Sequence, residues 1–129
     1  MAPTQRFTVL DPRFAVCRMS PGSTIPGSPA AAEFWSLSIT RDEISLVCEE
    51  SLVPSGCTSI ERTWRAIKVL GPLDFSLQGV MASLVGPLAE MHLGVFVVST
   101  YDTDYVLVKE FDLEPAVRTL QAAGHELVS

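Results

Sequence analysis

Residues 99–104, Ser-Thr-Tyr-Asp-Thr-Asp, bring together the side chains of this chain that are best suited to chemistry. Two carboxylates, those of Asp102 and Asp104, stand beside two threonine hydroxyls, and the flanking segments read as buried strands. Such residues form turns, because an Asp side chain bonds backbone groups two residues on, or they hold an ammonium group through charge-assisted hydrogen bonds. The spacing alone favours a turn. The apolar flanks favour a bound ammonium, because a carboxylate beside an apolar strand needs a cationic partner and the only lysine nearby is Lys109.

The same stretch is a poor match for a metal site. A hard cation such as Ca²⁺ takes six or more oxygen ligands, and an EF-hand loop spreads them over about twelve residues. Two carboxylates and one hydroxyl within residues 102–104 do not supply that set. We therefore expect neither a metal nor a cofactor in this protein.

The other reactive side chains do not form a catalytic motif. His92 and His125 fall near the ends of two predicted helices, and the sequence contains no H-E-x-x-H, G-x-S-x-G, P-loop or G-x-G-x-x-G pattern. Cys48 and a distant histidine would make a Cys–His dyad, but a thiol within the apolar segment "ISLVCEE" is far more often a core residue. We expect a protein that is not an enzyme, with a thiol-dependent activity as the least favoured interpretation.

Composition narrows the class of protein further. The chain has 129 residues and a net charge of −6, and its nine lysines and arginines are scattered, so we expect no contact with nucleic acid or with an anionic membrane surface. Three cysteines without a C-x-x-C pair indicate reduced thiols. No apolar run reaches the ~18 residues of a membrane helix, and no signal-peptide pattern opens the chain. These features predict a cytoplasmic protein.

The elements that position the polar stretch are clearest in the C-terminal part of the chain. The patterns predict a strand at residues 64–70, a helix within residues 75–93, two strands around the polar turn, a helix within residues 112–123 and a short strand at residues 125–128. Asp74 or Ser76 can cap the first helix, and Pro87 within it removes one backbone hydrogen bond. Asp112 caps the second helix and Gly124 stops it. The order βαββαβ predicts a ferredoxin-like α+β fold, a four-stranded antiparallel sheet with both helices on one face.

Residues 1–61 are predicted to form a smaller, β-rich half. The segment "RFTVLDPRFAVCRMS" reads as two short strands or as one strand interrupted at Asp11-Pro12. The segment "EFWSLSITRDEISLVCEE" reads as a hairpin that turns at Thr40 to Asp42. About sixty residues of short strands bury too little surface to fold alone. We expect this half to pack against residues 62–129 or to share a sheet with them.

Three segments of the C-terminal part carry a resemblance to a known family. They are the helix start at Gly79 to Ala82, the segment "GPLAE" at Gly86 to Glu90 and the segment "STYDTDYVLV" at Ser99 to Val108. Together they resemble the ACT domain, a small ligand-binding module of amino-acid metabolism. They are most similar to the small bacterial tandem-ACT proteins, which are related to the repeats of the eukaryotic cytosolic arginine sensor. The hairpin at residues 34–50 resembles the same subfamily, so the resemblance spans residues 7–128.

The resemblance implies a non-catalytic amino-acid-binding regulator built from two ACT-like units, an abbreviated one at residues 1–61 and a complete one at residues 62–129. In this subfamily the ligand lies between two units, and each presents a different surface. The first surface falls on Met91, Gly94 and Val95. The second surface falls on Asp74, Thr100, Tyr101, Asp102 and Asp104. One full unit cannot supply both surfaces, so the resemblance implies a homodimer whose ligand is a small amino acid.

The second surface suits the two poles of an amino acid. Backbone N–H groups at residues 76–79 would hold the carboxylate at the positive end of the helix dipole, and Gly79, without a Cβ, would let the ligand approach the backbone. Asp104, helped by Thr100 and Asp102, would hold the ammonium group. The resemblance therefore implies a site that recognises a zwitterion.

Three positions depart from the arginine sensor. Met91 and Gly94 stand where that sensor presents polar side chains, and Asp74 stands where it has a glycine. The resemblance therefore does not carry arginine over as the ligand. The competing interpretation is an oligomerisation or interaction scaffold that keeps the fold and has lost its ligand.

Overall fold

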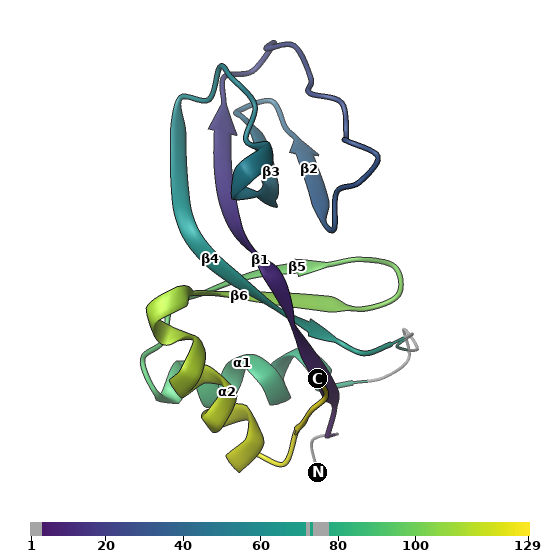
Figure 1. Cartoon of the computed structure of the whole chain (residues 1–129), viewed down its shortest axis with the longest axis vertical. Coiled ribbons are helices and arrows are strands. Elements are labelled where there is room, and N and C mark those ends of the chain that lie inside the picture. The colour runs from purple at the N-terminus through teal and green to yellow at the C-terminus, as the bar shows by residue number, and fades with distance from the viewer. Residues whose placement is uncertain (1–3, 72, 74–77) are drawn as a thin grey trace. The chain divides into compact units, whose positions relative to one another are not determined.

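The chain forms two compact units, and the C-terminal unit takes its residues from two separate parts of the sequence. A computed structural model describes residues 4–71, 73 and 78–129. The C-terminal unit comprises residues 4–11 and 65–129, and the N-terminal unit comprises residues 12–64. Two long strands, β1 (Arg6–Met19) and β4 (Ser59–Val69), contribute residues to both units (Figure 1). The predicted division into residues 1–61 and 62–129 concerns two ACT-like repeats, which need not coincide with the compact units. That division therefore stays a prediction.

The C-terminal unit has the predicted order of strands and helices. After β4 come α1 (Val80–Glu90), β5 (Val95–Ser99), β6 (Asp104–Lys109), the short 3₁₀ helix η2 (Glu110–Asp112), α2 (Leu113–Ala122) and β7 (Glu126–Leu127). The strands of this unit lie in the order β7-β1-β4-β6-β5, and β5 pairs with β6 antiparallel. The predicted ferredoxin-like α+β fold is confirmed.

The last strand differs from the prediction in its length and in its partner. The sequence predicts a strand at residues 125–128, whereas β7 has only two residues, Glu126 and Leu127, and pairs in parallel with β1. The place beside β4 is taken by β1. The reason lies in the side chains, because both residues of β7 are exposed whereas Phe7 on β1 is fully buried. The strand that fills this place must supply apolar side chains to the core, and β1 does so.

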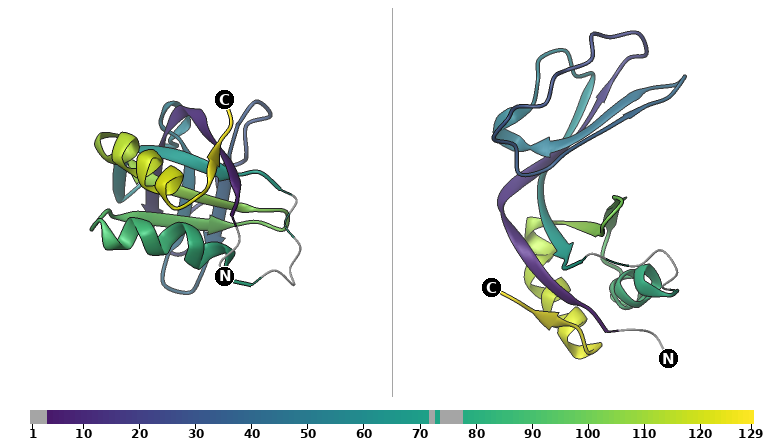
Figure 2. Two further views of the ribbon diagram at one scale, coloured as in Figure 1. Left: turned by 90° about the horizontal axis from the view of Figure 1, so that it is seen from below. Right: turned by 90° about the vertical axis from the view of Figure 1, so that its right-hand side faces the viewer.

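Both helices pack on the same face of this sheet. The predicted helical spacing of Val80, Leu84 and Leu88 is confirmed, because all three side chains are buried. They share one apolar core with Ala116 and Leu120 of α2 and with the buried side chains of the sheet, namely Phe7, Ile67, Val69, Val106 and Val108. Figure 1 and the left view of Figure 2 show α1 and α2 side by side. Burial of this apolar stripe is the main force that holds the helices on the sheet.

As predicted, Pro87 removes one hydrogen bond from α1, and this missing bond explains why a histidine is buried beside the helix. Pro87 lies within α1 and has no N–H, so the carbonyl of Ser83, four residues earlier, has no helical donor. The Nε2 atom of His125 lies 2.9 Å from that carbonyl oxygen, and its Nδ1 accepts the backbone N–H of Gln5 at 2.9 Å. Because Nδ1 accepts, Nε2 is the ring nitrogen that donates to the Ser83 carbonyl. His125, only 5% exposed, thus replaces the bond that proline removed.

The helix boundaries agree in part with the predicted caps. Gly79 precedes α1 with a φ of 78°, a left-handed conformation that favours glycine, while the predicted caps Asp74 and Ser76 lie outside the described residues. Asp112 precedes α2 as predicted, but its side chain makes no capping hydrogen bond among the described residues. The backbone of Asp112 is already helical after η2, whereas a capping residue is extended. Gly124 follows α2 with a φ of 99°, which confirms the predicted stop.

The N-terminal unit is built from strands alone apart from one short turn. It contains residues 12–19 of β1, β2 (Trp35–Ile39), β3 (Ile44–Glu49), the 3₁₀ helix η1 (Glu50–Leu52) and residues 59–64 of β4, with the strands in the order β2-β3-β1-β4. The predicted hairpin is confirmed, and β1 runs through Asp11-Pro12 as one strand. The core of this unit consists of Ala15, Cys17, Met19, Ile44, Leu46 and Cys48.

The two hairpins of the chain have the same local structure. Each has a strand of five residues, a turn of four, a strand of six and a 3₁₀ helix of three, with equivalent residues 60 positions apart. The N–H of Thr40 donates to the carbonyl of Glu43 at 2.9 Å, and that of Thr100 donates to the carbonyl of Thr103 at 2.8 Å. Both threonine hydroxyls also donate to the same carbonyls. This likeness supports the predicted repeat.

Candidate functional site

The turn that joins β5 to β6 forms one wall of a hollow of about 250 Å³ in the C-terminal unit. The hollow lies among β4, the segment that follows it, and the β5–β6 hairpin. Its lining residues are Lys68, Gly71, Thr100, Asp102, Thr103 and Tyr105. Two of the predicted site residues, Thr100 and Asp102, are therefore brought together in one concave surface.

The threonines of this turn are structural. Thr100 donates its hydroxyl to the carbonyl of Thr103 at 3.0 Å, which closes the turn. The hydroxyl of Thr103 donates to the carbonyl of Val69 on β4 at 2.6 Å, and the residue is only 6% exposed. These bonds fix the turn against the end of β4. The hydroxyls in the polar stretch thus belong to the framework of the hollow.

Gly71 allows the chain after β4 to approach the turn closely. The N–H of Leu73 donates to the carbonyl of Asp102 at 2.7 Å. A Cβ atom at position 71 would lie 2.7 Å from the same carbonyl oxygen, which is closer than van der Waals contact permits. A side chain at position 71 would therefore push the two segments apart. Glycine is required here for close approach of two backbones.

The hollow carries one positive and one negative side chain. Lys68, on β4, has its Nζ atom 6.0 Å from the centre of the Tyr105 ring, within the range of a cation–π contact. Asp102 is exposed at the tip of the turn. A carboxylate and an ammonium group of one small molecule can pair with these two charges by charge-assisted hydrogen bonds. The arrangement is complementary to a zwitterion.

Asp104 and Tyr101 belong to the same hairpin but do not line the hollow. Asp104 pairs with Ser99 across the hairpin, and its Oδ1 atom accepts the Ser99 hydroxyl at 2.6 Å. Tyr101 is 80% exposed. The predicted roles of both residues in ligand binding stay predictions.

The other predicted surface lies at the opposite end of β5. Met91 follows α1 and is 55% exposed, Gly94 is exposed, and Val95 begins β5 opposite Val108. The turn at residues 100–103 lies at the far end of the same strand. One copy of the chain therefore does not bring Met91, Gly94 and Val95 to the hollow. Asp74, predicted on the second surface, lies outside the described residues, and so do residues 76–77, whose backbone N–H groups are predicted to hold the ligand's carboxylate.

Sequence reasoning missed Lys68 and Gly71. Lys68 is the one charge in the apolar run "AIKVL" at the end of a strand, and Gly71 follows directly after this run. A charged residue within an apolar strand end, followed closely by glycine, was the available signal. Only the structure shows that the hairpin turn lies against these two residues.

The buried cysteines and the distribution of possible metal ligands bear on whether this chain could be a thiol enzyme or hold a metal ion. Burial, with a smaller effect from neighbouring thiols, raises the pKa of Cys17 to about 12, and burial raises that of Cys48 to about 11. Both groups are protonated near neutral pH, and only a thiolate is a good nucleophile, so Cys48 is a poor candidate for catalysis. Within residues 4–71, 73 and 78–129, no three acidic, histidine or cysteine side chains are grouped as metal ligands. No helix in this part of the chain could cross a membrane.

Sequence comparisons identify relatives of both units. A family model described as ACT domain matches residues 59–122, and a second model, described as an N-terminal domain, matches residues 12–56. The cytosolic arginine sensor for mTORC1 subunit 1 of Bos taurus is 35% identical in an alignment over 98 residues, which covers 68% of this chain and 30% of that protein. The human protein of the same name is 34% identical over 98 residues, again 68% and 30%. The chain thus spans about 30% of the length of these curated relatives.

Solved structures agree with the sequence matches. A protein of Agrobacterium tumefaciens has a TM-score of 0.89 and 34% identity, over 98% of this chain and 94% of its own. The aspartate kinase of Clostridium acetobutylicum has a TM-score of 0.65 and 14% identity, over 88% of this chain and 33% of its own. At that identity the kinase shows the fold alone. The similarity to the first structure extends over both units.

Proposed function

Because the chain belongs to the ACT-domain family, we propose that it binds a small free amino acid and acts as a sensor or regulator, without catalysing a reaction. The observation that carries this proposal is the hollow beside the β5–β6 turn, with Lys68 and Asp102 on its walls. Its volume of about 250 Å³ suits a molecule of amino-acid size. The raised pKa of Cys48, caused by burial, supports the absence of thiol catalysis.

In this proposal the two charges of the hollow bind the two poles of the ligand. The ligand's carboxylate pairs with the ammonium group of Lys68, which rests against the Tyr105 ring. The ligand's ammonium group pairs with Asp102, and Asp104 assists from the adjoining strand. The ammonium group of Lys68 would repel a ligand with a second positive charge. We therefore propose a neutral or acidic amino acid in preference to arginine.

We further propose that two copies of the chain associate to complete the site. The surface of Met91, Gly94 and Val95 from one copy would lie against the β5–β6 turn of the other. The exposure of Met91 and Tyr101, two large apolar side chains that belong to the two predicted surfaces, supports this arrangement. We also assign the protein to the cytoplasm, because its three cysteines are free thiols and its curated relatives are called cytosolic.

A thermal-shift screen with the twenty amino acids tests the binding proposal. A ligand at a hundred times its Kd adds about 2.7 kcal/mol to the free energy of unfolding, and for a chain of this size that corresponds to a rise in Tm of about 10 °C. Asp102→Asn and Lys68→Gln are expected to remove most of this rise. Asp42→Asn is the matched control, because Asp42 holds the equivalent place in the other hairpin and the rise should persist.

The screen also decides between a sensor and a scaffold. If no amino acid raises the Tm at millimolar concentration, the sensor proposal fails and an oligomerisation scaffold takes its place. A rise that survives both Asp102→Asn and Lys68→Gln would mean that the ligand binds elsewhere.

The mass of the protein in solution tests the dimer. Sedimentation equilibrium is expected to give twice the mass of the chain, and Met91→Glu is expected to give a monomer because it places a charge in an apolar interface. The same variant should lose the ligand-induced rise in Tm. A wild-type monomer that still binds the amino acid would contradict the shared site.

A further inference from the structure

The three cysteines of the chain lie together in the N-terminal unit. Cys17 on β1 and Cys48 on β3 belong to its apolar core, and Cys57, in the loop before β4, packs against that core. All three are free thiols. The thiols of Cys48 and Cys57 are both hydrogen-bonded to the thiol of Cys17. Cys17 therefore contacts two other thiols that come from distant parts of the sequence.

Backbone pairing explains why Cys57 lies against Cys17. The N–H of Thr58 donates to the carbonyl of Arg18 at 2.8 Å. The side chains of these two residues also meet on the exposed face, where the Arg18 guanidinium donates to the Thr58 hydroxyl at 3.3 Å. Successive side chains of an extended chain point to opposite faces. Cys17 and Cys57, each one residue earlier, therefore both point to the core side.

The strands hold Cys48 and Cys17 too far apart for a disulfide. Cys17 lies opposite Leu46 in the pairing of β1 with β3, and Cys48 lies opposite Ala15, so the two cysteines are diagonal neighbours. Diagonal neighbours have Cα atoms about 7–8 Å apart, whereas the Cα atoms of a disulfide lie about 4.4–6.8 Å apart. Because both residues are fixed by strand pairing, a bond between them would distort the sheet.

The chain around Cys57 is less constrained, because it is a loop. The Cys57 thiol donates to the carbonyl of Pro54 at 3.3 Å, and sulfur is a weak donor. The preceding Gly56 has a φ of 91°, and no other atom lies within 4 Å of the place where its Cβ would be. Loops of this kind move more readily than the strands that they connect. Cys57 is therefore the partner that can approach Cys17 closely enough for a disulfide.

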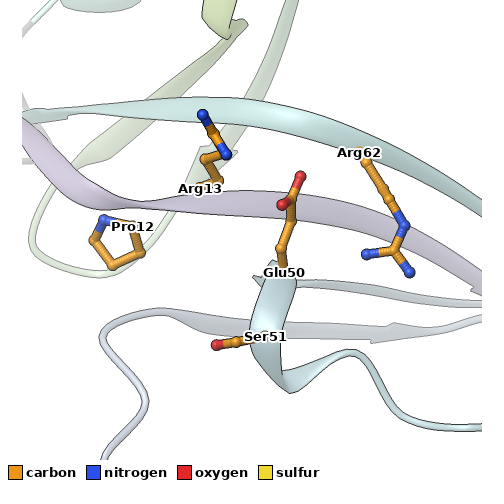
Figure 3. A pocket seen from close by; sticks show the side chains of 5 residues that line it. All are labelled: Pro12, Arg13, Glu50, Ser51 and Arg62. Carbon is orange, nitrogen blue, oxygen red and sulfur yellow. The ribbon is translucent and has the colours of Figure 1, made fainter.

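The thiol cluster is distinct from the hollow of about 440 Å³ in the same unit. Figure 3 shows the side chains that line this hollow, and none of these described residues is a cysteine: Pro12, Arg13, Glu50, Ser51 and Arg62. A small reagent therefore reaches the cluster through the exposed part of Cys57.

Exposure also decides which thiol reacts first. Cys17 is 1% exposed and Cys48 is 0% exposed, whereas Cys57 is partly exposed. Burial, with a smaller effect from the neighbouring thiols, raises the pKa of Cys17 to about 12, so its thiol is protonated near neutral pH. Oxidation of a cysteine follows its accessibility and its thiolate character. Cys57 is therefore the position at which an oxidant attacks, and Cys17 is the thiol that lies against it.

We propose that Cys57 and Cys17 form a disulfide in response to hydrogen peroxide, with Cys57 as the residue that is oxidised first. The Cys57 sulfur attacks one peroxide oxygen, so that an S–O bond forms and the O–O bond breaks. The hydroxide that leaves takes up the Cys57 proton as water. Cys57 is now a sulfenic acid, oxidised by two electrons.

The second step uses no further oxidant. The Cys17 sulfur attacks the Cys57 sulfur, so that the S–S bond forms and the S–O bond breaks, and the leaving hydroxide takes the Cys17 proton as water. In total, two thiols and one hydrogen peroxide give one disulfide and two waters. Cys17 attacks within the same unit, and this high effective concentration offsets the low fraction of its thiolate. Reduction by a small dithiol returns both thiols.

Peptide mapping of the full chain after treatment with a small excess of hydrogen peroxide tests the proposal. Free thiols are blocked with N-ethylmaleimide under denaturing conditions before digestion. Trypsin and Glu-C together separate Cys17, Cys48 and Cys57 into the peptides 14–18, 44–49 and 51–61. The expected product is peptide 14–18 joined to peptide 51–61 by a bond that dithiothreitol breaks, with Cys48 carrying the maleimide. The untreated chain should contain no joined peptides.

Variants separate the two roles. Cys57→Ala should abolish the joined peptides. Cys17→Ala should leave the sulfenic acid at Cys57 without a partner, so that dimedone labels peptide 51–61 more than in the wild type. Cys48→Ala is the matched control, because Cys48 is also buried and hydrogen-bonded to Cys17, and the joined peptides should persist.

The pH dependence of the second step distinguishes a reacting thiol from a packing residue. In the wild type the signal that dimedone labels should decay about tenfold faster at pH 8 than at pH 7, because the thiolate fraction of a group with a pKa of about 12 rises tenfold per pH unit. A rate of decay that does not change with pH would mean that Cys17 does not attack.

Three mapping results would overturn the proposal. The first is irreversible oxidation of Cys57 to a sulfinic acid without any joined peptides, which would mean that Cys17 cannot reach it. The second is a bond that includes Cys48 or that joins two copies of peptide 51–61 from different chains. The third is loss of the joined peptides in Cys48→Ala to the same extent as in Cys57→Ala.

Discussion

Replacing His125 by leucine tests whether its ring substitutes for the hydrogen bond that Pro87 removes. Leucine is apolar and fills much of the same space, but it bonds neither the Ser83 carbonyl nor the Gln5 N–H. A buried backbone group without a partner costs about 1–3 kcal/mol, and the Gln5 N–H is only partly buried. We therefore expect His125→Leu to lower the free energy of unfolding by about 3 kcal/mol.

A double-mutant cycle with Pro87→Ala isolates the bond to Ser83. Alanine at position 87 restores an N–H that can donate to the Ser83 carbonyl within α1. In that background His125→Leu leaves only the Gln5 N–H without its partner. Its cost should fall by about 1–2 kcal/mol, which is the coupling energy between positions 87 and 125.

Urea unfolding followed by circular dichroism measures all four free energies of the cycle. Equal m-values across the variants would show that unfolding exposes the same surface in each case. His92→Asn is the control, because the other histidine is exposed and its replacement should change stability by under about 0.5 kcal/mol. If His125→Leu costs the same with proline and with alanine at position 87, His125 does not replace the missing helical donor.

Four further predictions concern the turn and the thiols. Gly71→Ala should weaken amino-acid binding and lower stability by about 1–3 kcal/mol, because its Cβ would collide with the backbone of the turn, and calorimetry measures both. Thr103→Val should cost about 1–2 kcal/mol in urea unfolding, because it removes the buried bond to the Val69 carbonyl. Cys57 should be the thiol that a disulfide reagent modifies first near pH 8, with Cys17 protected by burial, and mass spectrometry of the digested protein identifies the modified residue. Burial raises the pKa of Cys17 to about 12 in the folded chain, so the unfolded chain loses this proton first and stability should fall as the pH rises from about 9 towards 12.

Each of these predictions has a variant or result that would contradict it. Gly86→Ala places a methyl group in open space on α1, so it should leave ligand binding unchanged, and a loss equal to that of Gly71→Ala would count against the collision. Thr103→Ser keeps the hydroxyl and should retain most of the stability. Modification of Cys17 before Cys57 would contradict the protected thiol. Cys17→Ala should reduce the alkaline loss of stability, and an unchanged pH dependence would assign that loss to other groups.

The sequence was informative wherever neighbouring residues decide the structure. The β5–β6 hairpin and the end of α2 at Gly124 were predicted because alternation, turn residues and glycine act within a few positions. The location of Thr100 and Asp102 at a concave surface agrees with the resemblance to the ACT family. Local patterns of this kind also predicted the hairpin of the N-terminal unit.

Features that depend on distant residues were not predictable in the same way. In the C-terminal unit β1, and not β7, pairs with β4. Burial of Phe7 on β1 favours this pairing, and no local sequence pattern predicts which strand is the neighbour of β4. Lys68 became part of the candidate site only because the turn lies against the end of β4. The sequence showed that Pro87 removes a hydrogen bond, but the donor that replaces it lies 42 residues from the Ser83 carbonyl.

The pairing of β1 with β7 has a consequence for how the chain folds during synthesis. Residues 6 and 7 pair with residues 126 and 127, and the bond from Arg6 to Glu126 spans 120 positions. Contacts between such distant positions slow folding, because a long loop must close before they contribute. On the ribosome, β1 emerges with Phe7 exposed. The core that buries Phe7 cannot form until β4, α1, β6 and α2 have been synthesised. Residues 14–19 of β1 can already pair with β3, but residues 6–11 stay an unpaired segment with an exposed Phe7, the kind of segment that aggregates or recruits chaperones.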